Sequence, residues 1–253
     1  MIKLLQCEYR KTRRQYIFLA SLAITAVQLC WALYNTYNDF TLKWGWMMFL
    51  YRFPLINTIF MPFLSIIVSS RLADIEHKGN MLKQFEAVTD KGKIYDAKFI
   101  YGISIVLICN LLNWSVTILF GYIKGFHGTV PIKLYLLYLL FTITPTTVIY
   151  IFQHILSLIF KNQAITFFAG IICTFCGLFS MFLPPIPFIR QILLWGYYGV
   201  LQFVGMFGWT KETRMANVYF EVVEINWVFF GVLIGAGIVM YIIGRYMFCR
   251  KEV

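Results

Sequence analysis

The chain has few residues that could carry enzymatic chemistry. Its three histidines, His77, His127 and His154, lie in three different regions, and no HExxH motif occurs, so the sequence gives no support to a membrane metalloprotease. No GxSxG motif occurs either, which leaves no nucleophile elbow. The only Gly-Lys pair, at positions 92–93, is followed by Ile94 and lacks the upstream glycine of a P-loop. We therefore expect no catalytic residue, metal or cofactor in this chain, and no ATP hydrolysis by the chain itself.

Charged residues are scarce as well, at 13% of the chain. None lies near the middle of an expected membrane span, where a charge costs ~2.5–3.5 kcal/mol and usually marks an ion pathway. Nothing in the sequence therefore indicates ion coupling. Cys173 and Cys176 have the spacing of a redox or zinc pair, but no histidine accompanies them, so we expect small buried side chains.

Apolar residues dominate, at 60% of the chain with a mean hydropathy of +0.73, against ~45–50% in a typical soluble domain. A membrane helix needs ~20 such residues. We predict an all-α, polytopic membrane protein that forms one domain over residues 1–253. Its six expected spans cover residues 16–34, 53–70, 99–122, 132–160, 164–183 and 227–248, with an outer loop over 35–52.

The polar side chains inside these spans are amides and one imidazole. We expect them to form hydrogen bonds between helices rather than a transport or relay pathway. They are Gln28, Asn57, Asn110, Asn113, Gln153 and His154.

Basic residues are distributed unevenly around the spans. Fifteen of the 22 Lys and Arg residues fall in segments that the six-span arrangement places inside the cell, and seven fall outside. This bias predicts that both termini are cytoplasmic. The net charge of +11 lies beside apolar segments, which indicates anionic lipid rather than nucleic acid as its partner.

The N-terminal 15 residues carry five of these basic residues against a single acid, Glu8. Ile2, Leu5 and Tyr9 fall near one helical face. The segment is expected to be a short helix in the cytoplasmic membrane interface, with a basic unstructured anchor as the alternative.

Residues 184–226 form a long outer segment that begins with Pro184, Pro185 and Pro187. Residues 188–207 are apolar, but Arg190 and several glycines argue against a seventh span. We expect re-entrant or surface-lying half-helices. Its aromatic side chains either contact a cargo or cap the pathway, and capping is preferred. They are Trp195, Tyr197, Tyr198 and Trp209.

Residues 71–98, called here the charged segment, hold twelve Lys, Arg, Asp, Glu or His residues among 28. Leu72 to Lys78 can extend the second span. Asn80 can cap a short second helix to about Thr89, and Lys91-Gly92 suits a helix end. Four residues of that helix form an apolar stripe, which either docks in a groove of a partner or lies against the membrane interface. They are Met81, Leu82, Phe85 and Val88.

Gly231 and Gly235 in the last span have the GxxxG spacing of close helix packing. They could pack within the subunit or between two subunits, and we expect the first.

This arrangement resembles the ABC-2 type exporter permeases. The likeness rests on the basic N-terminal helix, the six spans, the outer segment and the charged segment with Glu76, Gly79 and a following Leu/Phe helix. In that family a glutamate and a glycine precede the coupling helix that sits in the groove of the ATPase. Many members place a proline soon after this helix, and the stretch Val88 to Lys91 has none.

The start MIKLLQCEYRKTRRQYIFL is similar to permease subunits of lantibiotic-immunity transporters of Gram-positive bacteria. The resemblance implies a bacterial cell-membrane exporter of an antimicrobial peptide. It also implies a separate nucleotide-binding ATPase that uses ATP and Mg, and a second permease subunit, identical or related. The rivals are a non-transporting sensor or assembly factor, an exporter of another lipid or small molecule, and, more weakly, a membrane enzyme.

Overall fold

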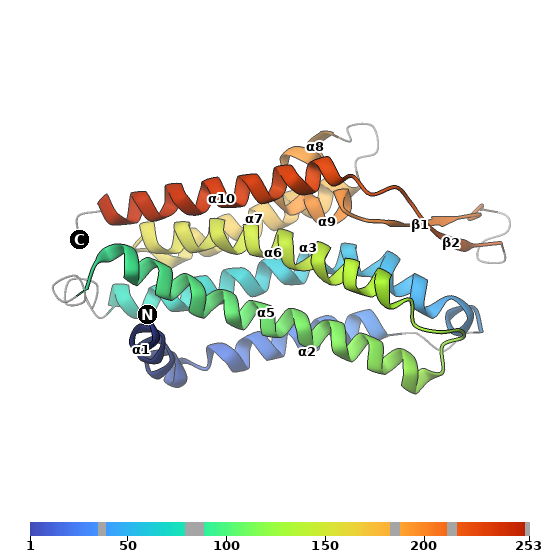
Figure 1. Ribbon diagram of the computed structural model, residues 1–253, viewed down its shortest axis with the longest axis horizontal. Coiled ribbons are helices and arrows are strands. Elements are labelled where there is room, and N and C mark those ends of the chain that lie inside the picture. The colour runs from blue at the N-terminus through green and yellow to red at the C-terminus, as the bar shows by residue number, and fades with distance from the viewer. Residues whose placement is uncertain (35–38, 79–88, 183–187, 212–216, 251–253) are drawn as a thin grey trace.

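A computed structural model describes residues 1–34, 39–78, 89–182, 188–211 and 217–250 of the protein. Long helices lie side by side along the longest axis of the molecule (Figure 1). We call the end that carries α1 and the C-terminal end of the last helix the terminal end. The opposite end carries a pair of short strands and is called the hairpin end.

The described elements follow in chain order. They are α1 (Ile2–Thr12), the 3₁₀ helix η1 (Arg13–Gln15), α2 (Ile17–Leu33), α3 (Asp39–Lys78), α5 (Lys91–Lys124), α6 (Ile132–Ile159), α7 (Gln163–Met181), α8 (Phe188–Ile192), η2 (Leu194–Gly196), α9 (Tyr197–Val200), β1 (Val204–Phe207), β2 (Tyr219–Val222) and α10 (Trp227–Arg250).

Five of the described helices are long and apolar enough to cross a membrane: α3, α5, α6, α7 and α10. A sixth span is obtained if α1 and α2, which meet at a bend of 74°, are counted together. Alone, α2 has 17 residues, the lower limit of ~17–25 residues for a spanning helix. The prediction of a helical, multi-pass membrane protein is confirmed.

Helix α3 lies at the centre of the fold and packs against α2, α5, α6 and α7. Near the hairpin end its aromatic side chains Trp46, Phe49 and Phe53 are buried. They pack edge-on or tilted against aromatic rings from other parts of the chain, including Phe126 and Tyr135. By contrast, α10 is the least enclosed of the five long helices and leaves many apolar side chains exposed.

The loop predicted over residues 35–52 is wrong for residues 39–52, which form the first part of α3. No glycine or proline interrupts the chain strongly enough to end the helix. Pro54 and Pro62 both lie inside it, as neighbouring helices and side-chain hydroxyls allow in membrane proteins. The Thr58 hydroxyl donates to the Pro54 carbonyl at 2.8 Å.

The charged segment differs from the prediction at its C-terminal side. Lys91 and Gly92 begin α5 rather than end a helix, and the Asp90 carbonyl accepts hydrogen bonds from the amides of Lys93 and Ile94. Burial of Ile94 and Tyr95 explains why the helix starts here. At the other side, α3 continues to Lys78, as predicted for Leu72 to Lys78.

The helices in the described part of the outer segment are all short: α8 has five residues, η2 has three and α9 has four. None of these can span a membrane, so residues 188–207 are not a seventh span, as expected. The antiparallel pair β1–β2 was not predicted. Phe220 of β2 is buried against Phe40, Trp44 and Tyr51 of α3, which explains the position of the hairpin.

Two side-chain predictions for the apolar spans need correction. Gly231 and Gly235 are exposed, and a Cβ atom at either would meet no other atom within 4 Å, so their expected packing within the subunit is wrong. Gly237 packs against Val148 of α6 instead, because it lies about 240° around the helix from Gly231. The cysteine prediction is wrong for Cys176, which is exposed, while Cys173 is half-buried.

Candidate functional site

The terminal end brings together the two helical stems of the charged segment. One stem is the end of α3, up to Lys78, and the other is the start of α5, from Lys91. Glu76 lies in the last turns of α3. Gly79, Met81, Leu82, Phe85 and Val88 lie outside the described residues, so their role stays a prediction.

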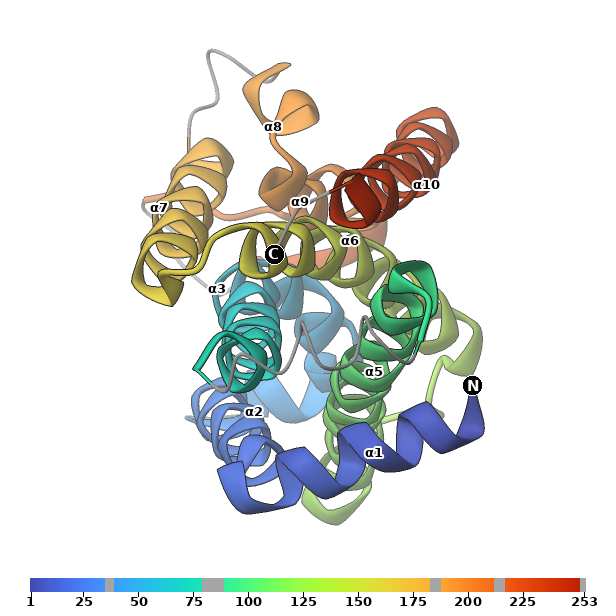
Figure 2. The ribbon, with the colours of Figure 1, turned by 90° about the vertical axis from the view of Figure 1, so that its left-hand side faces the viewer.

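The α5 stem is joined to α1 by a buried ion pair. Lys98 Nζ donates to Glu8 Oε2 at 3.0 Å, with side-chain exposures of 1% and 6%. The other oxygen of Glu8 accepts from Lys11 Nζ at 3.1 Å. A second link, 2.6 Å long, joins the hydroxyls of Thr12 and Tyr101. Helix α1 is therefore fixed across the ends of α2 and α5 (Figure 2).

The burial of α1 is the reverse of its apolar pattern. Its buried residues are Glu8 and Thr12, whereas Ile2 and Tyr9 are exposed, by 73% and 58%. A polar face thus holds the helix to the bundle, Leu4 and Leu5 are half-buried, and Ile2 and Tyr9 stay exposed to a lipid surface.

The α5 stem is also joined to α10. The Asp96 carboxylate accepts from Arg245 Nε at 2.9 Å and from the Tyr241 hydroxyl at 2.7 Å. Gly92 permits this approach, because a Cβ atom there would collide with the guanidinium group of Arg245.

The α3 stem is joined to α6, where a ring nitrogen of His77 lies 3.1 Å from the Ser157 carbonyl oxygen. Deeper in the bundle, His154 of α6 packs between the rings of Tyr95 and Tyr150, with centroid separations of 5.0 and 5.7 Å. The α5 stem is thus linked to α1 and α10, and the α3 stem is linked to α6.

Sequence reasoning missed the residues that make these links: Glu8, Asp96, Lys98 and Arg245. Glu8 gave a signal as the only acid in a basic segment. Lys98 gave another, since it is followed directly by a lipid-length apolar run. Neither signal identifies the partner, because residues 8 and 98 are brought together only by the fold.

The predicted polar residues of the spans form hydrogen bonds between helices in part. Gln28 donates to the Asn57 side chain at 2.7 Å, and Asn57 donates to Tyr138 and Thr142, which connects α2, α3 and α6. Gln153 donates to the Thr166 carbonyl. Asn110 instead bonds within its own helix, to the Val106 carbonyl. Among the described residues, no group of three or more His, Cys, Asp or Glu side chains could hold a metal ion.

The outer aromatic residues fall into two groups. Trp195, Tyr197 and Tyr198 are buried, with at most 5% exposed, whereas Trp209 is 53% exposed. The Tyr198 hydroxyl lies 2.8 Å from that of Thr146, and burial raises the pKa of Tyr198 above its usual value. In this conformation the three buried rings are packed into the fold, and Trp209 is the one open to a ligand.

Fold and links together define a multi-pass helical membrane protein in which the two stems of the charged segment belong to spanning helices. Residues 4–177 match the family model described as "ABC-2 family transporter protein". The chain therefore belongs to the ABC-2 transporter family, whose members are the permease components of ABC transporters. No curated protein matches the chain.

Proposed function

We propose that this chain is the membrane subunit of an ATP-driven exporter and that a separate nucleotide-binding ATPase, with ATP and Mg, docks on the charged segment. The observation that carries the proposal is the continuity of α3 and α5, which extend from the charged segment through the bundle as helices of 40 and 34 residues. At ~1.5 Å per residue these helices are ~60 and ~50 Å long. Movement at the docking site would thus reach the far side of the membrane.

The docking surface in this proposal is an apolar stripe that follows Glu76 and Gly79 in the sequence. It consists of Met81, Leu82, Phe85 and Val88. Closure of an ATPase pair on ATP would pull the stripe. The links to α1 through Lys98 and to α10 through Asp96 would pass this motion to helices that do not touch the ATPase.

The terminal end faces the cytoplasm of a bacterial cell in this proposal. It gathers α1, the two stems of the charged segment, Lys161 and Arg250, and with them most of the basic residues of the chain. Both termini would then be cytoplasmic.

A second permease subunit, identical or related, would complete the transporter. The exposed face of α10 around Gly231 and Gly235 is a surface on which two subunits could approach closely.

The proposed cargo is an amphipathic antimicrobial peptide, taken from the membrane and released outside. The resemblance of the N-terminus to lantibiotic-immunity permeases supports it. Exposed Trp209 would contact the cargo, and the buried outer aromatics would act as the cap. The alternatives are another lipid or small-molecule cargo, or a sensor or assembly factor that transports nothing.

Cell survival in the presence of a membrane-active peptide tests this function. The chain is expressed with its ATPase, either active or with the Walker-B acid replaced. Survival that increases only with the active ATPase supports export. Equal survival with the inactive ATPase contradicts export and favours a sensor. A Leu82→Asp/Phe85→Asp variant should lose both ATPase association and protection, whereas the control Trp209→Asp/Val222→Asp should keep ATPase association.

A further inference from the structure

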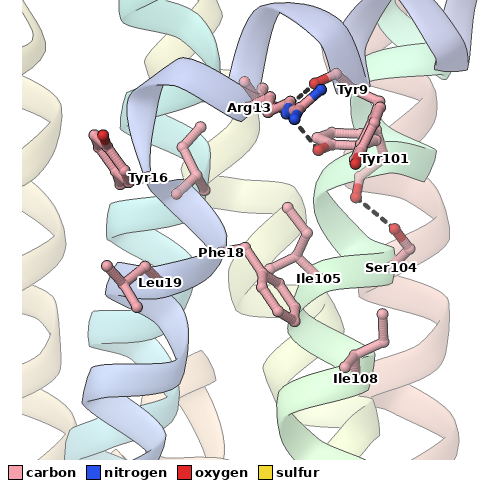
Figure 3. Close-up of a pocket in the computed structure, with 11 residues that line it drawn as sticks. Tyr9, Arg13, Tyr16, Phe18, Leu19, Tyr101, Ser104, Ile105 and Ile108 are labelled. Atoms are coloured by element: carbon pink, nitrogen blue, oxygen red, sulfur yellow. Dashed lines mark hydrogen bonds between the residues drawn. The ribbon is translucent and has the colours of Figure 1, made fainter.

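A cavity of about 520 Å³ opens beneath the α1–α2 bend (Figure 3). It lies between α2 and α5, at the terminal end of the bundle. Its volume falls within the ~300–1,000 Å³ of typical small-ligand pockets. None of the residues that line it belongs to the charged segment's stem at Lys91–Lys98 or to the outer aromatic group.

The two ends of this cavity differ in chemistry. Under α1 its wall carries Arg13 and the phenol rings of Tyr9 and Tyr101. Further along α2 and α5 its wall is apolar, formed by Phe18, Leu19, Ile105 and Ile108 (Figure 3). Such a cavity suits a molecule with an anionic or polar head and a hydrocarbon tail.

Arg13 is the charged group of the polar end. Among the described residues that line the cavity none is acidic, and the nearby carboxylate of Glu8 is already bonded to Lys11 and Lys98. A neighbouring hollow of about 980 Å³ shares Tyr9, Arg13 and Tyr16 and adds Arg10. The electrostatic complement of this region is therefore an anion.

The roof of the cavity is held in place without a ligand. The Thr12 hydroxyl bonds both to the Tyr9 carbonyl, at 3.2 Å, and to the Tyr101 hydroxyl, which fixes the end of α1 over α5. Tyr16, at the bend, has a left-handed backbone (φ 53°, ψ 27°). A tyrosine rarely adopts this conformation, and such strain tends to collect at ligand sites.

The apolar end of the cavity opens on the side of the bundle. Phe18, Leu19 and Ile108 are 49%, 62% and 44% exposed, on helices that belong to candidate membrane spans. Acyl chains of the bilayer would surround these side chains.

We propose that this cavity binds one anionic phospholipid of the leaflet next to the terminal end. Its phosphate lies under Arg13 within hydrogen-bond reach of the Tyr9 and Tyr101 hydroxyls, and one acyl chain lies between α2 and α5. This site is separate from the ATPase docking surface and does not depend on the cargo.

Native mass spectrometry of the purified full chain in detergent, without any ATPase, tests the proposal. The probes are phosphatidylglycerol, phosphatidylcholine and soluble glycerol phosphate. Phosphatidylglycerol should be retained about tenfold better than phosphatidylcholine. Arg13→Gln should reduce its retention about tenfold, equivalent to ~1.4 kcal/mol. The matched control Lys3→Gln removes one exposed charge of α1 outside the cavity and should retain the lipid.

Ile108→Trp tests the acyl-chain part of the site. It should fill the space between α2 and α5 and displace the lipid, whereas Leu119→Trp, at an exposed position on the same helix, should not. If Arg13→Gln and Ile108→Trp both retain phosphatidylglycerol as well as the wild-type chain does, the proposal is overturned. Displacement of the lipid by equimolar glycerol phosphate would overturn the lipid assignment in favour of a headgroup-only anion site. Failure of the ATPase-dependence experiment would leave this result unaffected.

Discussion

The ion pair between Glu8 and Lys98 is almost fully buried. It joins α1 to α5 through two residues that are 90 positions apart in the sequence. Burying two charges costs much of what their attraction returns, so such a pair contributes little net stability. Removing Lys98, however, leaves the buried carboxylate of Glu8 with Lys11 of its own helix but without its partner on α5. We therefore assign the pair to positioning α1 over α5.

Lys98→Met is expected to destabilise the protein by about 1.5–3 kcal/mol, because Glu8 would lose one buried, charge-assisted hydrogen bond and keep only its bond to Lys11. Thermal unfolding in detergent measures the change. The matched control is Lys93→Met on the same helix, where the side chain is exposed. The double variant Glu8→Met/Lys98→Met should regain most of the loss. Equal unfolding temperatures for Lys98→Met and Lys93→Met would contradict the assignment.

Individual residues were predictable from the sequence only where the local pattern decides their environment. The interhelical hydrogen bonds of Gln28, Asn57 and Gln153 follow from polar side chains in apolar spans. The partner of Lys98 could not be predicted in this way, because it depends on where the bend at Tyr16 places α1.

At the scale of whole elements, the spans were predictable because ~20 consecutive apolar residues have few other stable environments. Their ends were less so. Residues 39–52 contain interfacial aromatics that also suit a loop, and only the packing of Trp46 and Phe49 makes them helical. The β1–β2 hairpin depends on contacts with α3 that no local pattern reveals.

Helix α10 gives a direct test of which face packs inside the subunit. Gly237→Val should destabilise the fold by roughly 1–3 kcal/mol, as overpacking does, because the new side chain would collide with Val148. Gly231→Val on the exposed face should unfold at the wild-type temperature. Thermal unfolding of the solubilised subunit measures both variants. A lower unfolding temperature for Gly231→Val than for Gly237→Val would show that the other face of α10 packs against α6.

For the whole molecule, the arrangement predicts that Trp209 and the end of α10 lie on opposite sides of the membrane. In a background with all six cysteines replaced by serine, Trp209→Cys should react with a membrane-impermeant maleimide in intact cells. Arg250→Cys should react only after the cells are permeabilised. Labelling of Arg250→Cys in intact cells would contradict a cytoplasmic terminal end.

The charged segment and its position between two apolar runs were evident from the sequence, whereas its role as a docking site stays a prediction. A charged segment between two apolar runs indicates a contact with soluble partners, and the helical stems agree with that role. Its links to α1, α6 and α10 required the fold. Through these links, movement of the charged segment would be passed to α1, α6 and α10.

The central claim is that a separate ATPase acts on this chain through the charged segment. Co-purification of the tagged chain with its P-loop ATPase tests it most directly. We expect the ATPase to be retained by the wild-type chain and by Trp209→Asp/Val222→Asp at the hairpin end, and to be lost from a folded Leu82→Asp/Phe85→Asp variant. Unchanged retention by that variant, or no associated ATPase with the wild-type chain, would contradict the claim.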